Sequence, residues 1–190
     1  RWNYHSSDSY LAGLLMNRYL HKKPGASNDP FFDLLLSQFW TPLELSAVSE
    51  FTRRTYDEEA QPFTGYGLTF HPDDIVRIAK WLNEGAGELG GKSLLDTTMF
   101  AAAMQTSARK AIPPLASQGL DYRYGFWAAE ASSWVGCQQE TWLPFMSGFG
   151  GITVVLLPND MIYYYFSDSG IFRWAAPVIE AHKIRPICHE

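Results

Sequence analysis

Two runs of β-branched and aromatic residues near the end of the chain constrain its fold more than any other feature. Residues 151–157 read GITVVLL and residues 161–167 read MIYYYFS, and the turn sequence Pro158-Asn159-Asp160 separates them. Runs of this composition joined by a short turn are typical of an antiparallel hairpin. The alternating segment YRYGFWAA, residues 122–129, predicts further strand structure. We therefore expect a small antiparallel sheet in the C-terminal part of the chain.

Helical spacing of apolar residues dominates the chain before this sheet. The first helix is expected to begin with Ser7 or Asp8 as its N-cap, and one closing helix is expected after the sheet. The order favours an α+β fold over the alternation of a parallel fold. We expect a mainly helical region at residues 1–115 and a sheet region with a C-terminal helix at residues 116–190. The predicted helices lie near residues 8–21, 30–41, 72–83, 94–105 and 172–182.

Charge and cysteine content exclude several functions. The net charge is −5 and the Lys and Arg residues are scattered, so no basic stripe exists for a nucleic-acid backbone. No apolar run approaches the roughly 20 residues that span a bilayer. Cys137 and Cys188 form no zinc pattern with the five histidines, and we expect neither a metal nor another cofactor. Whether the two cysteines form a disulfide is left open.

Two short motifs resemble known catalytic or binding sequences without the required context. Residues 86–93, AGELGGKS, fit a relaxed phosphate loop, but a helix precedes them where a strand is needed, so a glycine-rich connection between helices is the favoured interpretation. Residues 107–110, SARK, fit the serine-lysine pair S-x-x-K but stand before the loop sequence AIPPLASQG. Nucleotide binding is therefore the weakest of the functions considered.

The small residues of SGFGG, 147–151, stand at the start of a predicted strand and allow close backbone approach. Such a strand end can supply the amide of Phe149 to an oxyanion hole, or it can be a simple glycine bulge. The residues alone favour neither interpretation.

The opening sequence NYHSSDSYLAGLL, residues 3–15, poses a similar choice between a helix cap and a catalytic corner. In the catalytic interpretation, Tyr4 is a general base or proton relay beside Ser6. A tyrosine has a pKa near 10, so this role needs a shift of roughly three units, about 4 kcal/mol. A neighbouring lysine is the simplest cause of such a shift.

Taken in order, these segments resemble the serine hydrolases of the β-lactamase and penicillin-binding-protein fold. The closest likeness is to the class C-like branch, which includes esterases and 6-aminohexanoate-dimer hydrolases. The resemblance covers nearly the whole chain, although no single motif is strict. It implies an acyl-enzyme reaction on an ester or amide, a group that includes β-lactams and peptides, and a periplasmic or secreted location.

The resemblance also implies roles for individual residues. Tyr4-His5-Ser6 matches the Y-x-S form of the family's second element, so Tyr4 would transfer protons and Ser6 would order the site. Ser147-Gly148 matches the end of the K-T-G element on the strand that edges the site, with the Phe149 amide as an oxyanion donor. Met146 replaces the lysine, which favours a neutral ester or amide over a substrate bound through its carboxylate.

The family's S-x-x-K lies upstream of its tyrosine element, whereas SARK lies downstream of Tyr4, so the nucleophile is not assigned to Ser107. We therefore expect a chain that is inactive alone and lacks the first strands of its sheet. Such a sheet would expose an edge and an apolar face, which predicts a complementing N-terminal segment or partner chain. The alternative is a non-catalytic relative that serves as a binding or structural module.

Overall fold

The computed structural model describes residues 3–27, 29–105 and 113–188 and has an α+β fold. The chain forms two compact units, residues 3–78 and residues 79–190, and helix α3 (Pro72–Asn83) runs across the boundary. The regions expected from the sequence divide at residue 115 according to helix and strand content. In the structure, helix α4 (Thr97–Met104) belongs to the same compact unit as the sheet.

The first unit is built from α1 (Ser6–His21), α2 (Pro30–Leu35) and the start of α3. A π-helical turn, η1 (Leu36–Trp40), extends α2, and a 3-10 turn, η2 (Ala47–Glu50), follows. Trp40 anchors this unit, because its ring packs edge-on against Phe32 at 5.2 Å and against Phe70 at 5.8 Å between centroids. Such aromatic pairs add to the free energy gained from burial alone.

Helix α1 begins earlier than its capping sequence predicts. The N-cap is His5, with extended backbone and no side-chain cap, so the expected cap at Ser7 or Asp8 is wrong. The N–H of Asp8 donates to the carbonyl of His5 at 3.1 Å, which closes the first turn through the backbone. Asp8 still stabilises the helix from within that turn, because its carboxylate lies near the positive end of the helix dipole.

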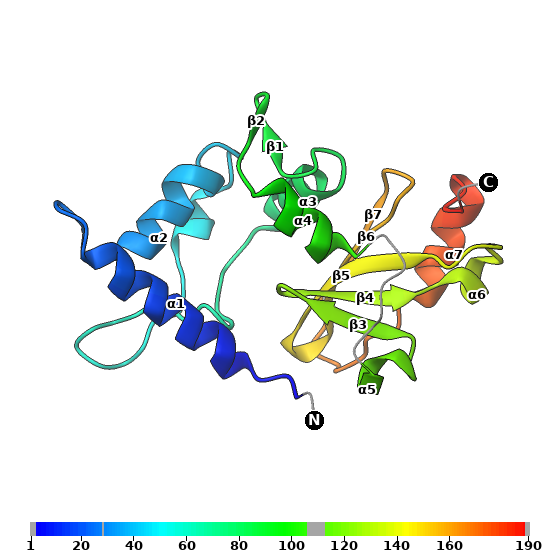
Figure 1. Ribbon diagram of the computed structural model, residues 1–190, viewed down its shortest axis with the longest axis horizontal. Coiled ribbons are helices and arrows are strands. Elements are labelled where there is room, and N and C mark those ends of the chain that lie inside the picture. The colour runs from blue at the N-terminus through cyan, green and yellow to red at the C-terminus, as the bar shows by residue number, and fades with distance from the viewer. Residues whose placement is uncertain (1–2, 28, 106–112, 189–190) are drawn as a thin grey trace. The chain divides into compact units, whose positions relative to one another are not determined.

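The second unit contains a five-stranded antiparallel sheet whose strands follow one another in chain order (Figure 1). The predicted hairpin is confirmed, with Leu156 opposite Ile162. The segment YRYGFWAA forms two strands, because Tyr124 and Gly125 have φ of 47° and 90° and make a two-residue turn. The strands are β3 (Leu120–Arg123), β4 (Phe126–Glu130), β5 (Trp142–Gly148), β6 (Ile152–Leu156) and β7 (Ile162–Tyr165).

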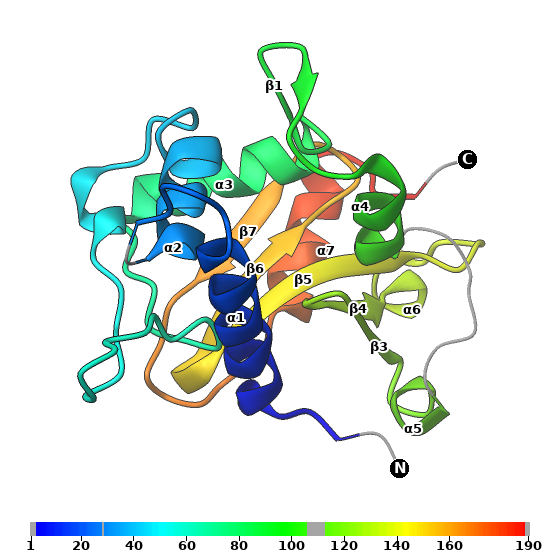
Figure 2. The ribbon, with the colours of Figure 1, turned by 60° about the vertical axis from the view of Figure 1, so that its left-hand side comes forward.

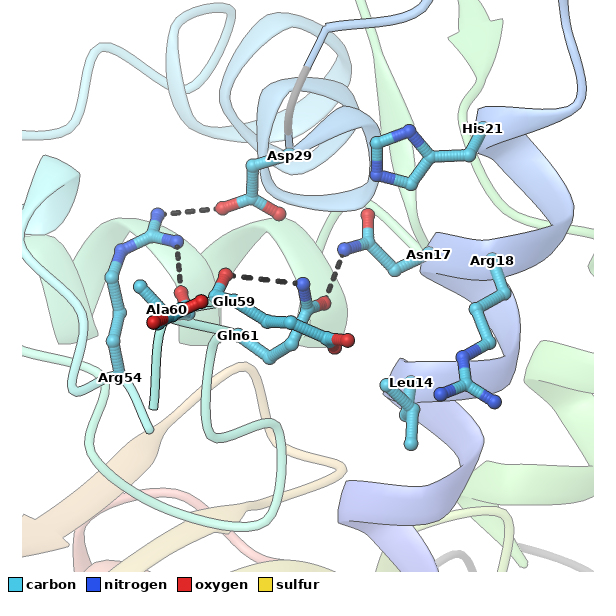
Figure 3. Close-up of a pocket in the computed structure, with 10 residues that line it drawn as sticks. Leu14, Asn17, Arg18, His21, Asp29, Arg54, Glu59, Ala60 and Gln61 are labelled. Atoms are coloured by element: carbon cyan, nitrogen blue, oxygen red, sulfur yellow. Dashed lines mark hydrogen bonds and ion pairs between the residues drawn. The ribbon is translucent and has the colours of Figure 1, made fainter. Parts of the chain in front are cut away.

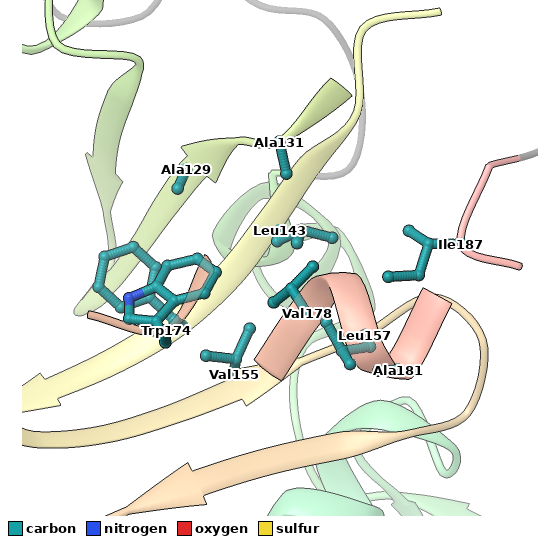
Figure 4. Packing of buried hydrophobic residues seen from close by; sticks show 10 residues of the cluster. Ala129, Ala131, Leu143, Val155, Leu157, Trp174, Val178, Ala181 and Ile187 are labelled. Carbon is teal, nitrogen blue, oxygen red and sulfur yellow. The ribbon is translucent and has the colours of Figure 1, made fainter. Parts of the chain in front are cut away.

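Helix α7 (Ala175–Ile184) lies along one face of the sheet (Figures 1 and 2). Its buried face meets alternate residues of β5 and β6 (Figure 4). Period-2 alternation puts Leu143 and Phe145 on this face, together with their cross-strand partners. The fully buried members of this core are Ala131, Leu143, Val155, Leu157, Val178 and Ile187.

Shorter elements complete the second unit and correct two expectations. The AGELGGKS segment is a hairpin of β1 (Glu88–Leu89) and β2 (Lys92–Ser93), with Gly90 and Gly91 both at positive φ in its turn. It lies between α3 and α4, so its interpretation as a glycine-rich connection between helices is confirmed, and it lacks the strand-to-helix geometry of a phosphate loop. Helix α4 begins at Thr97, later than the expected Leu94, because Asp96 is the N-cap and accepts a hydrogen bond from the N–H of Met99.

The second correction concerns AIPPLASQG, residues 111–119, expected to be a loop. Its described part contains a helical turn, α5 (Pro113–Ala116), where proline at the first position favours helix formation. A further turn, α6 (Ser132–Val135), precedes Cys137 and was not expected from the sequence. Residues 107–110, SARK, lie outside the described residues.

Cys137 and Cys188 form a disulfide, with their Cα atoms 5.3 Å apart, which answers the question that the sequence leaves open. The bond ties the segment after α6 to the segment after α7. Within the described ranges, no helix is long and apolar enough to cross a membrane. The same residues contain no group of three or more His, Cys, Asp and Glu side chains that could hold a metal ion.

Candidate functional site

Ser147 and Gly148 are the last two residues of β5, the middle strand of the sheet, and they pair with Thr153 and Ile152 of β6. The residues that follow, Phe149–Gly151, form a 3-10 turn. SGFGG is thus a connection between two strands. Gly151 leads directly into β6, as expected, and Ser147 and Gly148 also end the strand before it.

The turn depends on its two glycines. Gly150 and Gly151 have φ of 82° and 108°, which side-chain-bearing residues rarely adopt. A Cβ on Gly151 would lie 2.9 Å from the carbonyl oxygen of Ile171, and the N–H of Gly170 donates to the carbonyl of Gly150 at 2.9 Å. The connection is therefore held tightly against the segment that follows β7, and the backbone of Phe149 is held with it.

Side chains of the proposed substrate-binding residues leave the strand in different directions. Ser147 shares its face of the sheet with Phe145, the face that α7 covers further along, whereas Met146 lies on the opposite face beside Val154. Ser147 is exposed and Met146 is half-buried. The two side chains are adjacent in sequence, but they do not form one surface.

Phe149 is 94% exposed, so its ring contributes almost nothing to the core. Ile152 and Ile171, on either side of the glycine turn, are also exposed. The end of β5 is therefore an apolar surface that surrounds a rigid backbone turn. Such a surface suits an apolar group of a ligand better than a charged one.

Tyr4 and Ser6 lie in the other unit, at the beginning of α1, and both are exposed. The backbone there is fixed by a segment that the sequence does not mark. The Thr64 hydroxyl donates to the carbonyl of Ser9 at 2.5 Å, and a Cβ on Gly65 would lie 2.5 Å from the carbonyl oxygen of Ser6. Thr64-Gly65 therefore positions the corner that carries Tyr4 and Ser6.

The first unit also holds a polar pocket that sequence patterns did not reveal (Figure 3). It has a volume of about 580 Å³ and lies between α1 and the segment around residues 54–61. Asn17 forms part of its floor and is 1% exposed. The Asn17 amide donates to Gln61 Oε1 at 2.5 Å, and its oxygen accepts from the N–H of Phe31 at 3.1 Å. Both ends of this buried amide are thus satisfied.

Arg54 crosses the pocket from the other side. Its guanidinium lies 2.6 Å from Asp29 Oδ2 and donates to the carbonyl of Ala60 at 2.9 Å. It also stacks over the Phe32 ring, 5.2 Å from the centroid. Asp29-Pro30 was predicted only as a helix start, and nothing in the sequence indicated that Asp29 would meet a cation 25 residues further along. Such pairing depends on tertiary structure and leaves no local pattern.

No known family matches the chain, and no curated protein resembles it significantly. The fold on its own defines an α+β protein with a five-stranded antiparallel sheet.

Proposed function

We propose that this chain is the C-terminal part of a serine hydrolase of the β-lactamase and penicillin-binding-protein class, in the esterase-like branch. The observation that carries the proposal is the order of its segments along the chain. A Y-x-S corner at a helix start precedes an antiparallel sheet in which Ser147-Gly148 ends a strand just before a glycine turn. An α+β architecture with a closing helix on one sheet face is compatible with this class.

The reaction is acyl transfer from an ester or amide. A serine hydroxyl attacks the carbonyl carbon, its proton passes through Tyr4 to the leaving alcohol or amine, and water then hydrolyses the acyl-enzyme. The Phe149 amide stabilises the oxyanion, because a backbone N–H held rigidly at a strand end needs no reorganisation. Ser6 orders the proton-transfer corner, and Ser147 and Gly148 contact the substrate.

Met146 restricts the substrate class. A thioether stands where the resemblance places a lysine and offers no positive charge to a substrate carboxylate. The exposed side chains around the glycine turn, Phe149, Ile152 and Ile171, are apolar. We therefore propose a neutral, apolar ester or amide as the substrate.

The serine and its lysine come, in this proposal, from a complementing N-terminal segment or partner chain. An apolar stripe on α1 supports this step, because Leu11, Leu15 and Tyr19, one turn apart, are all more than half exposed. Edge strands β3 and β7 each lack a second partner strand among the described residues. Both features suit association with further polypeptide.

The test is reconstitution with the polypeptide encoded upstream of Arg1. The mixture is expected to hydrolyse a chromogenic acetate ester and to be labelled by a fluorophosphonate, whereas this chain alone does neither. Tyr4→Phe is expected to lower the hydrolysis rate at least a hundredfold, as loss of a general base does. The matched control is Tyr19→Phe on the same helix. A mixture that forms a complex and shows neither reaction excludes the catalytic proposal.

A non-catalytic binding module is the second candidate, and the preformed polar pocket of the first unit favours it. The upstream coding sequence distinguishes the two. An S-x-x-K about a hundred residues before Tyr4 supports the hydrolase, and its absence supports the binding module. The disulfide fits an oxidising compartment and thus an exported protein in either case.

A further inference from the structure

The polar pocket of residues 3–78 has a rigid floor. Gln61 joins its two sides, accepting from Asn17 through Oε1 and donating through Nε2 to the carbonyl of Glu59 at 3.3 Å. Arg54 fixes Asp29 on the far side, as Figure 3 shows. A volume of about 580 Å³ lies within the range typical of small-molecule sites.

One buried atom of this floor lacks a partner. Asp29 Oδ1 is inaccessible to solvent and accepts no hydrogen bond from any described residue, although Oδ2 of the same carboxylate meets Arg54. A buried acceptor without a donor is unfavourable by about 1–3 kcal/mol, and by more when it is charged. Because Oδ1 is closed to solvent, it acts on a ligand in the pocket through the charge of the carboxylate and not through a direct hydrogen bond.

Further charges line the pocket without forming ion pairs. Arg18 projects from α1, and Glu58 and Glu59 lie across from it. None of these three side chains makes an ion pair or hydrogen bond within the described part of the chain. The pocket thus presents to a ligand the unpaired positive charge of Arg18 and the unpaired negative charges of Glu58 and Glu59.

We propose that this pocket binds a small zwitterion, namely a free amino acid or a short peptide. The ligand's ammonium group pairs with the Glu58-Glu59 side of the pocket, and its carboxylate pairs with Arg18. A purely cationic or purely anionic ligand would leave one set of these charges unpaired. This site is independent of the proposed hydrolase site, because it uses none of that site's residues.

Three matched probes test the charge requirement. Alanyl-alanine carries both charges, alanyl-alaninamide only the ammonium, and N-acetyl-alanyl-alanine only the carboxylate. Titration of the intact chain by NMR at pH 7 is expected to give a dissociation constant for alanyl-alanine about tenfold lower than for either singly charged probe, since one charged contact is lost in each. Equal affinities for the three probes, or no binding at millimolar concentration, would overturn the proposal.

Two conservative variants separate the contacts. Arg18→Gln is expected to weaken the binding of alanyl-alanine about tenfold and to leave the affinity for alanyl-alaninamide unchanged. Glu59→Gln is expected to weaken the binding of both of these probes and to leave the affinity for N-acetyl-alanyl-alanine unchanged. Both side chains carry no structural hydrogen bond, so the melting temperatures are expected to match the wild type. Glu50→Gln, on η2 and outside the pocket, is the control. Variants that fold and bind all probes as the wild type does would contradict the proposal.

Discussion

Asp74 shows how one buried side chain can define the start of a helix. It lies in the first turn of α3 and is 2% exposed. Its carboxylate accepts hydrogen bonds from the N–H and hydroxyl of Ser46, at 2.7 and 2.5 Å, and from the N–H of His71 at 2.9 Å. Burial raises the pKa of Asp74, but the hydrogen bonds from Ser46 and His71 outweigh it and hold the pKa below its ordinary value.

Replacement of this carboxylate is expected to destabilise the chain in a pH-dependent way. Asp74→Asn should lower the free energy of unfolding by about 2 kcal/mol at pH 7, because charged hydrogen bonds become neutral ones and one acceptor becomes a donor. The folded-state pKa is lowered, so the stabilisation is complete above the unfolded pKa of about 4 and is lost as pH falls through the folded pKa.

Urea unfolding at several pH values checks this expectation. The difference in unfolding free energy between the wild type and Asp74→Asn should become smaller as the pH falls below about 4. Asp73→Asn is the matched control, since Asp73 shares the first helical turn but its side chain is 83% exposed. If the difference in unfolding free energy between Asp74→Asn and the wild type stays constant across this pH range, the stabilising role of the Asp74 carboxylate is contradicted.

At the scale of elements, the connection between β6 and β7 and the end of α7 hold each other in place. The Asn159 amide donates to the carbonyl of Arg185 at 2.6 Å, and the Arg185 guanidinium donates to the carbonyl of Asn159 at 2.9 Å. The disulfide and buried Ile187 secure the segment just beyond. The turn predicted from Pro158-Asn159-Asp160 thus also caps the helix C-terminus, a role no local pattern indicates.

Removal of the disulfide is expected to weaken this corner without altering the sheet. The bond closes a loop across a sequence separation of 51, so the double variant Cys137→Ser/Cys188→Ser should lose about 4 kcal/mol of unfolding free energy in the chain-entropy estimate. Thermal unfolding with and without reductant measures the effect. Reductant should lower the melting temperature of the wild type to that of the double variant and leave the double variant unchanged. Equal melting temperatures for the oxidised wild type and the double variant would contradict this role.

Helices and strands with a strong local sequence pattern were predicted well. The elements that were not predicted depend on contacts between distant parts of the chain. The hairpin of β6 and β7 follows from its residue types, and α3 from its acidic start and apolar stripe. Residue patterns alone do not predict β5, because Pro144 argues against a middle strand. The strand tolerates it because pairing with β6 begins only at Phe145.

At the scale of the whole molecule, the site was less predictable than the fold. The sequence drew attention to Tyr4 and to residues 146–149, which lie in different compact units, and their roles stay predictions. The polar pocket of Asp29, Arg54 and Gln61 was missed because its residues are distant in sequence and individually common. Unpaired polar groups become visible only once the chain is folded.

The apolar stripe of α1 leads to the last prediction. Leu11, Leu15 and Tyr19 are 53%, 66% and 64% exposed, so their removal should not affect folding of this chain. The double variant Leu11→Gln/Leu15→Gln is expected to keep the unfolding free energy within about 0.5 kcal/mol of the wild type. It should nevertheless bind the upstream polypeptide at least tenfold more weakly, because burial of a leucine side chain is worth about 1.5–3 kcal/mol.

Sedimentation of the mixture and urea unfolding of the isolated chain measure the two quantities separately. Lys22→Gln/Lys23→Gln, just beyond the end of α1, is the control for a change of equal size without loss of apolar surface. If the double leucine variant unfolds easily, the stripe belongs to the core of this chain and the complementation proposal loses its main support. If the variant is stable and binds as tightly as the wild type, the upstream segment docks elsewhere, and the edges of β3 and β7 become the surfaces to test.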